Sequence, residues 1–167
     1  MANFNEFFKR VAKWNELRSP RIYNKDLTRK LLLEEHNELL EAQTAVDRLD
    51  ALCDLIYVAT GAIWKLKQDR PILSHLAKPK LWVDGFVDDS DLIMLKGIVS
   101  SCLSRMGEMG LTHKQCLRAL MIVCDSNDTK PVKMTASSVK IAKGDTFVAP
   151  EPRLAALLNE VGAVWTK

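Results

Sequence analysis

The chain has 167 residues, of which 47% are hydrophobic, so it can build a sizeable core and we expect one domain over residues 1–167. Its 24 basic and 21 acidic residues leave a net charge of +3, which is too small to indicate nucleic-acid binding. The four cysteines lack the spacing of a zinc site or a disulfide framework, and no apolar run is long enough to span a bilayer. A cytoplasmic protein without membrane contact is therefore expected.

Helical periodicity runs along the chain to about residue 126. Apolar residues at three- and four-residue steps predict a first helix over 4–18, which ends before a proline. A second helix is predicted over 24–43, with Asn24 as its N-cap and no Gly or Pro to interrupt it. The residues that follow resemble a capping box, so a third helix is predicted over 44–68.

The predicted third helix is apolar on nearly all sides. In a small protein, such a helix needs more cover than its own chain provides, which suggests an oligomer interface and at least a dimer. Residues 69–88 contain two prolines and indicate a loop. A cap at 88–90 then predicts a fourth helix over 92–109, which ends at Gly110, and a fifth helix follows over 112–125.

The character of the sequence changes after Asp125. Residues 126–131 have turn chemistry, and residues 132–149 mix β-branched residues with lysines, which predicts a lysine-rich loop or hairpin. Pro152 suits the first turn of a closing helix. The predicted fold class is therefore all-α: a helical bundle built on two long antiparallel helices, followed by an irregular lysine-rich segment.

Carboxylates on the second and third predicted helices are expected to face each other. A short turn makes these helices antiparallel neighbours, and the acids on each helix recur at three- and four-residue steps, which keeps them on one face. Oxygen-only ligands of this kind suit Mg²⁺ or Mn²⁺, which would relieve the repulsion between the acids and bind a nucleotide's phosphates. The acids are Glu34, Glu35, Glu38 and Glu41 on the second helix and Asp47, Asp50 and Asp54 on the third.

These acids do not all carry the same weight. Asp47 is explained as a capping residue, and glutamates such as Glu34 usually lie on a solvated helix face. Asp54 is different, because nearly all its neighbours are apolar and a buried, unpaired charge is costly without a metal ion or a fixed cation. Glu38 lies near Leu39 and is expected to be partly enclosed. Glu38 and Asp54 together therefore favour a functional site.

Two further features have a structural and a functional interpretation. Trp14 is most simply a core residue, although its place near a helix end would let a nucleotide base reach it. Lysines after Asn127 usually belong to a solvated loop, but a turn with Asn and Lys beside a metal site would form a phosphate clamp. Both features join the candidate substrate-binding residues.

Several motifs resemble those of one family. Residues 34–38, Glu-Glu-His-Asn-Glu, match the EExxE motif of the MazG-like all-α nucleoside triphosphate pyrophosphohydrolases, and residues 50–61 look like their second acidic motif with its Tyr-Val-x-x-Gly tail. Residues 126–130 and 143–150 resemble the Ser-Asn-x-x-Lys and Lys-Gly-x-x-Phe segments of small, phage-encoded members. One departure is Ala51, which stands where many members carry the first acid of an ExxD motif; the acid here falls one position earlier.

The resemblance implies a MazG-like helical bundle that hydrolyses a nucleoside triphosphate between the α and β phosphates, with Mg²⁺ or Mn²⁺ as cofactor. Glu34 would bind a second ion or orient the attacking water, and the lysines would contact phosphates from the same or a neighbouring subunit. The residues implied are Glu34, Glu35, Glu38 and Asp54 for catalysis; Glu35, Glu38, Asp50 and Asp54 for the metal; and Asn127, Lys130, Lys143, Trp14, Arg29 and Lys30 for the substrate.

The resemblance also bears on the substrate and the assembly. Phage-encoded relatives of this shape include enzymes that act on dGTP and dATP, so a purine deoxynucleotide is the expected substrate. A homo-oligomer, dimer or tetramer, with shared active sites is implied, located in the host cytoplasm if the chain is phage-encoded.

Other functions stay open at this point. Phosphoribosyl-ATP pyrophosphohydrolases share the acidic helices, but they are generally shorter and lack the segment 127–150. Another nucleotide such as dUTP is a further possible substrate. A non-catalytic helical oligomer whose acids hold a structural ion, or pair with Arg29 and Lys30, belongs to a different class. Nucleic-acid binding through the C-terminal lysines is the least favoured, since no basic, aromatic-rich surface is evident.

Overall fold

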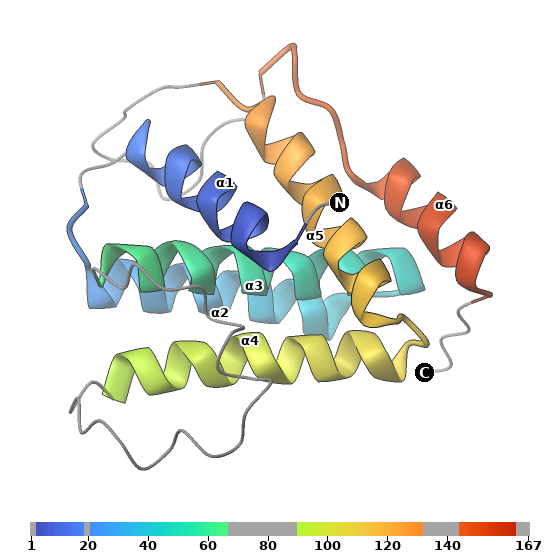
Figure 1. The fold of residues 1–167 in the computed structure, drawn as a ribbon, viewed down its shortest axis with the longest axis horizontal. Coiled ribbons are helices and arrows are strands. Elements are labelled where there is room, and N and C mark those ends of the chain that lie inside the picture. Colours follow the sequence, from blue (N-terminus) through green and yellow to red (C-terminus); the bar gives the residue numbers. More distant parts are fainter. Residues whose placement is uncertain (1–2, 19–20, 67–89, 132–143, 163–167) are drawn as a thin grey trace.

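A computed structural model describes residues 3–18, 21–66, 90–131 and 144–162 of the chain. Within these residues the protein is all-helical and has no strand, which confirms the predicted fold class (Figure 1). The predicted loop over 69–88 and most of the predicted lysine-rich hairpin lie outside the described residues. The helices are α1 (Phe4–Glu16), α2 (Lys25–Glu41), α3 (Ala45–Lys65), α4 (Ser90–Glu108), α5 (His113–Asp128) and α6 (Glu151–Val161).

Helices α2 and α3 form an antiparallel hairpin whose ends the sequence specifies locally (Figure 1). The Asn24 side chain accepts a hydrogen bond from the Leu27 backbone N–H, so it caps α2 as predicted. Thr44 and Asp47 form the predicted capping box of α3, with each side chain accepting from the other residue's backbone N–H. Only three residues, 42–44, join α2 and α3, so the two helices must pack side by side.

Helix α3 is the centre of the bundle and contacts each of the other five described helices. Most of its residues from Leu49 to Trp64 are buried, and fully buried side chains such as Leu52 and Ile63 are among the largest in the core. The premise that this all-round apolar helix needs cover from another subunit is therefore wrong, because the chain's own helices supply that cover. Among the described helices, none is both long enough and apolar enough to cross a membrane.

Helix α5 begins as predicted and ends later than predicted. Thr112 and Gln115 form a capping box at its start. Ser126 and Asn127, which we expected in a turn, are helical and buried, because the last turn of α5 packs against α1. Asp128 is the last helical residue. Turn-forming residue types are therefore overruled here by burial and by tertiary contacts.

Ion pairs fasten α1 and α6 to the end of α5. The Arg10 guanidinium donates to the Asp125 carboxylate at 2.8 Å and also pairs with Asp128. Arg153 donates to the other Asp125 oxygen at 2.7 Å. Burial opposes ionisation of Asp125, but hydrogen bonds from the two arginines outweigh it and lower the pKa of the carboxyl group. Asp125 therefore links three helices.

The described part of the C-terminal segment, residues 144–150, folds back onto the end of α5. The Val148 backbone N–H donates to the Thr129 hydroxyl at 2.9 Å, and the Thr146 hydroxyl donates to the Thr129 carbonyl at 3.3 Å. Gly144 lies against the ring of Pro131. Two segments that are well separated in the sequence thus lie side by side, directly before α6 begins.

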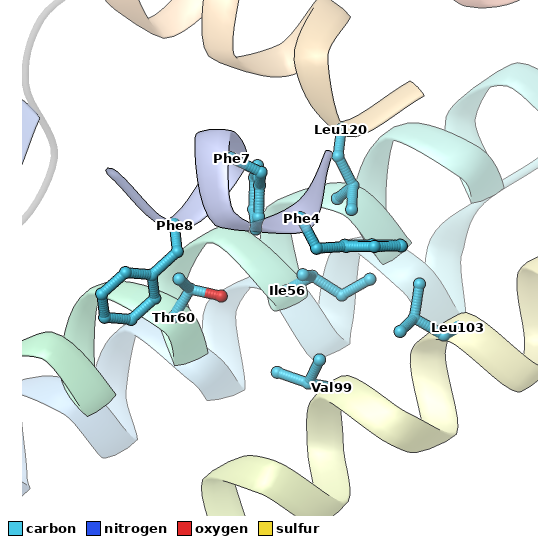
Figure 2. Close-up of a pocket in the computed structure, with 8 residues that line it drawn as sticks. All are labelled: Phe4, Phe7, Phe8, Ile56, Thr60, Val99, Leu103 and Leu120. Atoms are coloured by element: carbon cyan, nitrogen blue, oxygen red, sulfur yellow. The ribbon is translucent and has the colours of Figure 1, made fainter. Parts of the chain in front are cut away.

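A small pocket lies between the start of α1 and helices α3, α4 and α5 (Figure 2). Its volume is about 10 Å³, and three phenylalanine rings contribute to its lining. The Thr60 hydroxyl borders it and has no hydrogen-bond partner among the described residues. Since ligand pockets usually enclose at least about 300 Å³, this cavity is a packing gap in the core and not a nucleotide site. The lining residues are Phe4, Phe7, Phe8, Ile56, Thr60, Val99, Leu103 and Leu120.

Gly61 allows α1 to approach α3 closely. A Cβ atom at this position would lie 2.8 Å from Nδ2 of Asn15, a buried side chain that donates to the Val11 carbonyl. Alanine in a helix is favoured over glycine by about 1 kcal/mol, but overpacking a core costs about 1–3 kcal/mol, so the clash should prevail.

We therefore predict that Gly61→Ala lowers the free energy of unfolding, measured by urea denaturation. Gly97→Ala is the matched control, because a Cβ there meets nothing within 4 Å in helix α4, and it should raise stability by about 1 kcal/mol. In an Asn15→Ala background the effect of Gly61→Ala should turn stabilising. A destabilising effect of the same size in both backgrounds would contradict the contact.

Candidate active site

The acidic residues of α2 differ in exposure from what the sequence suggests. Glu35 is the most buried of them, with 6% of its surface exposed, whereas Glu34 is half-buried and Glu38 is exposed. The expectation that Glu38 is partly enclosed is therefore wrong. The reason is the phase of the helix: Thr28, Leu32, Glu35 and Leu39 form the buried stripe of α2, which places Glu35 toward the core.

Of the three aspartates of α3, Asp50 and Asp54 are half-buried and Asp47 is exposed. The sequence predicted that solvent would not reach Asp54, and this prediction is wrong, because part of the Asp54 surface is exposed. The residue lies on the side of α3 that the other helices cover least completely. The charge of Asp54 acts on two buried neighbours, Cys53 and Tyr57. The pKa of the Cys53 thiol is raised by burial and then by the charges of Asp50 and Asp54, and Asp54 also adds to the raised pKa of Tyr57. Asp54 thus lies between the core and the surface.

Asp50 is where charges from several helices meet. Burial raises the pKa of its carboxyl group to about 7, and repulsion from Glu151, Glu35 and Glu38 adds to the effect, while Lys130 opposes it. The Oδ1 atom of Asp50 is buried and has no hydrogen-bond partner among the described residues. The charges of Glu35 and Glu38 on α2 therefore act on Asp50 of α3.

Lys130 reaches this acidic group from the end of α5. Its backbone carbonyl accepts a hydrogen bond of 2.8 Å from the Arg18 guanidinium, which fixes the chain just beyond the helix. Its ammonium group lies 5.8 Å from the centre of the Phe147 ring, a contact between the two C-terminal segments. The structure therefore places one of the predicted phosphate-binding residues where its charge acts on Asp50, a predicted metal ligand.

Trp14 and Asn127 contact each other, although 113 positions separate them. The Trp14 indole N–H donates to the Asn127 carbonyl at 2.9 Å, and the Arg18 guanidinium lies 4.3 Å from the indole ring centre. An edge contact with Tyr57, at 5.8 Å between ring centres, completes this packing. Trp14 is half-buried, and Asn127 is buried, so both residues serve the packing of α1 on α5 in this structure.

The remaining predicted substrate-binding residues are less informative. Arg29 and Lys30 are exposed on α2, one turn before the acids. Lys143 lies outside the described residues.

Sequence reasoning missed Glu151, whose charge acts on Asp50, and Arg18, which contacts both Trp14 and Lys130. Neither has a motif to indicate it, since Glu151 looks like an ordinary acid in the first turn of a helix.

The donor chemistry of this site fits a hard divalent cation. Glu35, Asp50 and their neighbours offer only carboxylate oxygens, which Mg²⁺ and Mn²⁺ prefer, and a cation would relieve the repulsion that acts on Asp50. In the part of the chain that the structure describes, however, no group of three His, Cys, Asp or Glu side chains is arranged so that it could hold a metal ion. The cation site therefore stays a prediction that needs the carboxylates to move closer together.

Comparison with known proteins gives one match. The family model of phosphoribosyl-ATP pyrophosphohydrolase matches residues 1–67, which comprise α1, α2 and α3 with both acidic groups. No curated protein matches the chain, and no solved structure does. The N-terminal part of the chain is therefore similar to a family of nucleotide pyrophosphohydrolases, and residues 68–167 lie outside the match.

The raised pKa of Asp50 predicts a stability that depends on pH. The folded protein holds this proton more tightly than the unfolded chain, whose carboxyl has a pKa near the ordinary value of 3.8. The free energy of unfolding should therefore fall as the pH rises from about 4 to about 7, where the penalty becomes complete. Asp50→Asn cannot ionise, so it should be more stable than the wild type by about 1–3 kcal/mol at about pH 8 and nearly equal to it at about pH 4.

Urea unfolding in EDTA at both pH values measures this difference, with Asp26→Asn, an exposed aspartate of α2, as the control. Equal pH dependence of the wild type and Asp50→Asn would show that the Asp50 carboxyl is not strained by its neighbours.

Proposed function

We propose that the protein is a nucleotide pyrophosphohydrolase, which splits a nucleoside triphosphate into the monophosphate and pyrophosphate with Mg²⁺ or Mn²⁺ as cofactor. The observation that carries the proposal is that Glu35 and Glu38 of α2 and Lys130, two residues beyond the end of α5, all act electrostatically on Asp50 of α3. The similarity of residues 1–67 to phosphoribosyl-ATP pyrophosphohydrolases supports the same reaction type.

The residues have distinct tasks in this proposal. Glu35, Glu38, Asp50 and Asp54 hold the divalent cation, which when bound supplies Lewis acidity and lowers the pKa of a water molecule. Glu34, half-buried beside Glu35, orients the attacking water or binds a second ion. Lys130 neutralises charge on the phosphates, as a compact cation near the carboxylates would. Lys143, Asn127, Arg29, Lys30 and Trp14 are further candidates for substrate contacts.

We further propose a purine deoxynucleoside triphosphate, dGTP or dATP, as the substrate. The support is the resemblance of residues 126–130 and 143–150 to segments of small phage-encoded members of the MazG-like enzymes. In the structure, residues 144–148 lie against Thr129 and Lys130, and the charge of Lys130 acts on Asp50.

Phosphoribosyl-ATP is a second candidate substrate, because the matching family model carries that activity in its description. The match covers the helices with the acids but not the segments around Lys130 and Phe147. These segments distinguish the two candidates. The purine deoxynucleotide proposal uses them for substrate contacts, whereas the phosphoribosyl-ATP alternative needs only the matched part of the chain.

The decisive test is chromatographic product analysis of the purified protein with dNTPs, dUTP, GTP and phosphoribosyl-ATP, in Mg²⁺ and then in EDTA. We expect a monophosphate and pyrophosphate from dGTP or dATP in Mg²⁺ only, without a diphosphate intermediate. Preference for a pyrimidine nucleotide or for phosphoribosyl-ATP by about tenfold, which is about 1.4 kcal/mol in transition-state binding, would reject the purine assignment.

Glu38→Gln tests the site within the same assay. Glutamine keeps the volume and helix propensity of glutamate but removes a ligand charge, so turnover should fall by at least about 100-fold with an unchanged circular dichroism melt. Glu108→Gln, an exposed glutamate at the end of α4, is the matched control and should retain full activity. Full turnover in Glu38→Gln would remove this residue from the site.

We also propose that the active form is a homo-oligomer. Leu33 and Leu40 lie two turns apart on the outer side of α2, and they are 51% and 70% exposed. Ile93 and Met94 of α4 are also exposed. Burying such residues in a subunit contact is favourable by about 25 cal/mol per Å². Light scattering should therefore give the mass of a dimer or tetramer, and Leu33→Glu with Leu40→Glu should reduce it; a wild-type monomer at micromolar concentration would exclude the proposal.

A further inference from the structure

Arg18 is a buried arginine just beyond the end of α1, with 9% of its surface exposed. Arginine is rarely buried, because its charge is costly to remove from water, so the groups that it binds indicate its role. Here the guanidinium donates to two backbone carbonyls, to that of Trp14 at 3.3 Å and to that of Lys130 at 2.8 Å. The shorter bond joins the end of α1 to the residue that we propose as a phosphate contact.

The Trp14 ring fixes the orientation of this guanidinium. The Arg18 Cζ atom lies 4.3 Å from the centre of the indole ring, a contact that is favourable for a planar cation over an aromatic face. The indole N–H in turn donates to the Asn127 carbonyl in the last turn of α5 at 2.9 Å. The ring that holds the guanidinium is therefore itself attached to α5, close to Lys130.

Both polar groups of the Lys130 backbone are bound. Its N–H donates to the Asn127 carbonyl at 3.1 Å, and its carbonyl accepts from Arg18. A lysine side chain is long and loses much rotational freedom when it is held at a ligand. Fixing the backbone on both sides of the Cα atom reduces the volume that the ammonium can sample. Arg18 therefore controls the region that the Lys130 ammonium reaches.

We propose that Arg18 is a positioning residue, which acts through the Lys130 backbone to hold the Lys130 ammonium where it contacts the phosphates of the substrate. This inference rests on the proposed function, because it takes Lys130 as a phosphate contact. Arg18 does not bind phosphate itself, since its side chain is buried and its Nη1 and Nη2 atoms both donate to carbonyls. Its effect on affinity comes from pre-organisation, which lowers the entropy lost on binding.

The experiment measures by calorimetry, in Mg²⁺, the affinity for a dGTP analogue in which a methylene group replaces the oxygen between the α and β phosphates. Arg18→Met should weaken binding by about tenfold, the size expected when a hydrogen bond from a charged group is lost. Lys130→Met removes the ammonium but keeps the carbonyl that Arg18 binds. In that background, Arg18→Met should change the affinity by less than about twofold, because the two residues act as one unit.

Arg21→Met is the matched control. The Arg21 guanidinium lies 5.1 Å from the centre of the Trp64 ring and donates to the Trp64 carbonyl at 2.9 Å, so Arg21 makes the same kinds of contact near the end of α3. This variant should leave the analogue affinity unchanged. Amide hydrogen exchange, followed by nuclear magnetic resonance, reports on the backbone directly: the Lys130 amide should exchange faster in Arg18→Met and at the wild-type rate in Arg21→Met.

Wild-type affinity in Arg18→Met would overturn the inference, and so would an equal loss of affinity with and without the Lys130 ammonium. If Arg18→Met does not fold, Arg18→Lys, which lacks the planar guanidinium, is measured in its place with the same outcomes. The proposed function is judged separately by wild-type turnover of dNTPs. Turnover with independent effects of the two substitutions refutes the inference alone, and coupled effects on analogue binding without turnover refute the proposed function alone.

Discussion

The fold depends on the burial of most of α3. This helix contacts all the other described helices, so its length and its caps determine where each of them can lie. Gly61 shows how tight this arrangement is, because even one added carbon would meet the Asn15 side chain of α1. Asp50 and Asp54 interrupt the apolar residues of α3, and both are only half-buried, so the surrounding helices cover α3 less completely at these positions. The candidate site therefore lies where the core of the bundle reaches the surface.

The C-terminal half of the chain is held near the acids by polar contacts. Asp125 receives Arg10 from α1 and Arg153 from α6, and Arg18 holds the carbonyl of Lys130. Partly exposed ion pairs of this kind contribute little stability one by one. Their effect here is on position, because they direct the end of α5 and the start of α6 toward the carboxylates of the hairpin.

The sequence predicts features that depend on local chemistry. The caps at Asn24, Thr44 and Thr112 are confirmed, because each requires only residues within one helical turn. It predicts less well which side of α2 is buried: Glu35 and Glu38 are only three positions apart, and their exposure depends on the rotation of α2 against α3. Glu151 was missed because its electrostatic effect on Asp50 acts across about 100 positions of the sequence, for which no local pattern exists.

Asp50 is a carboxyl group at a position where its ionised form is unfavourable. A protein selected only for stability would place an amide or an apolar residue there, because burial and repulsion from Glu151 raise the pKa of the carboxyl to about 7. Strained charges of this kind are common where a ligand relieves the strain. A divalent cation bound among these carboxylates, as proposed above, would replace their mutual repulsion with attraction.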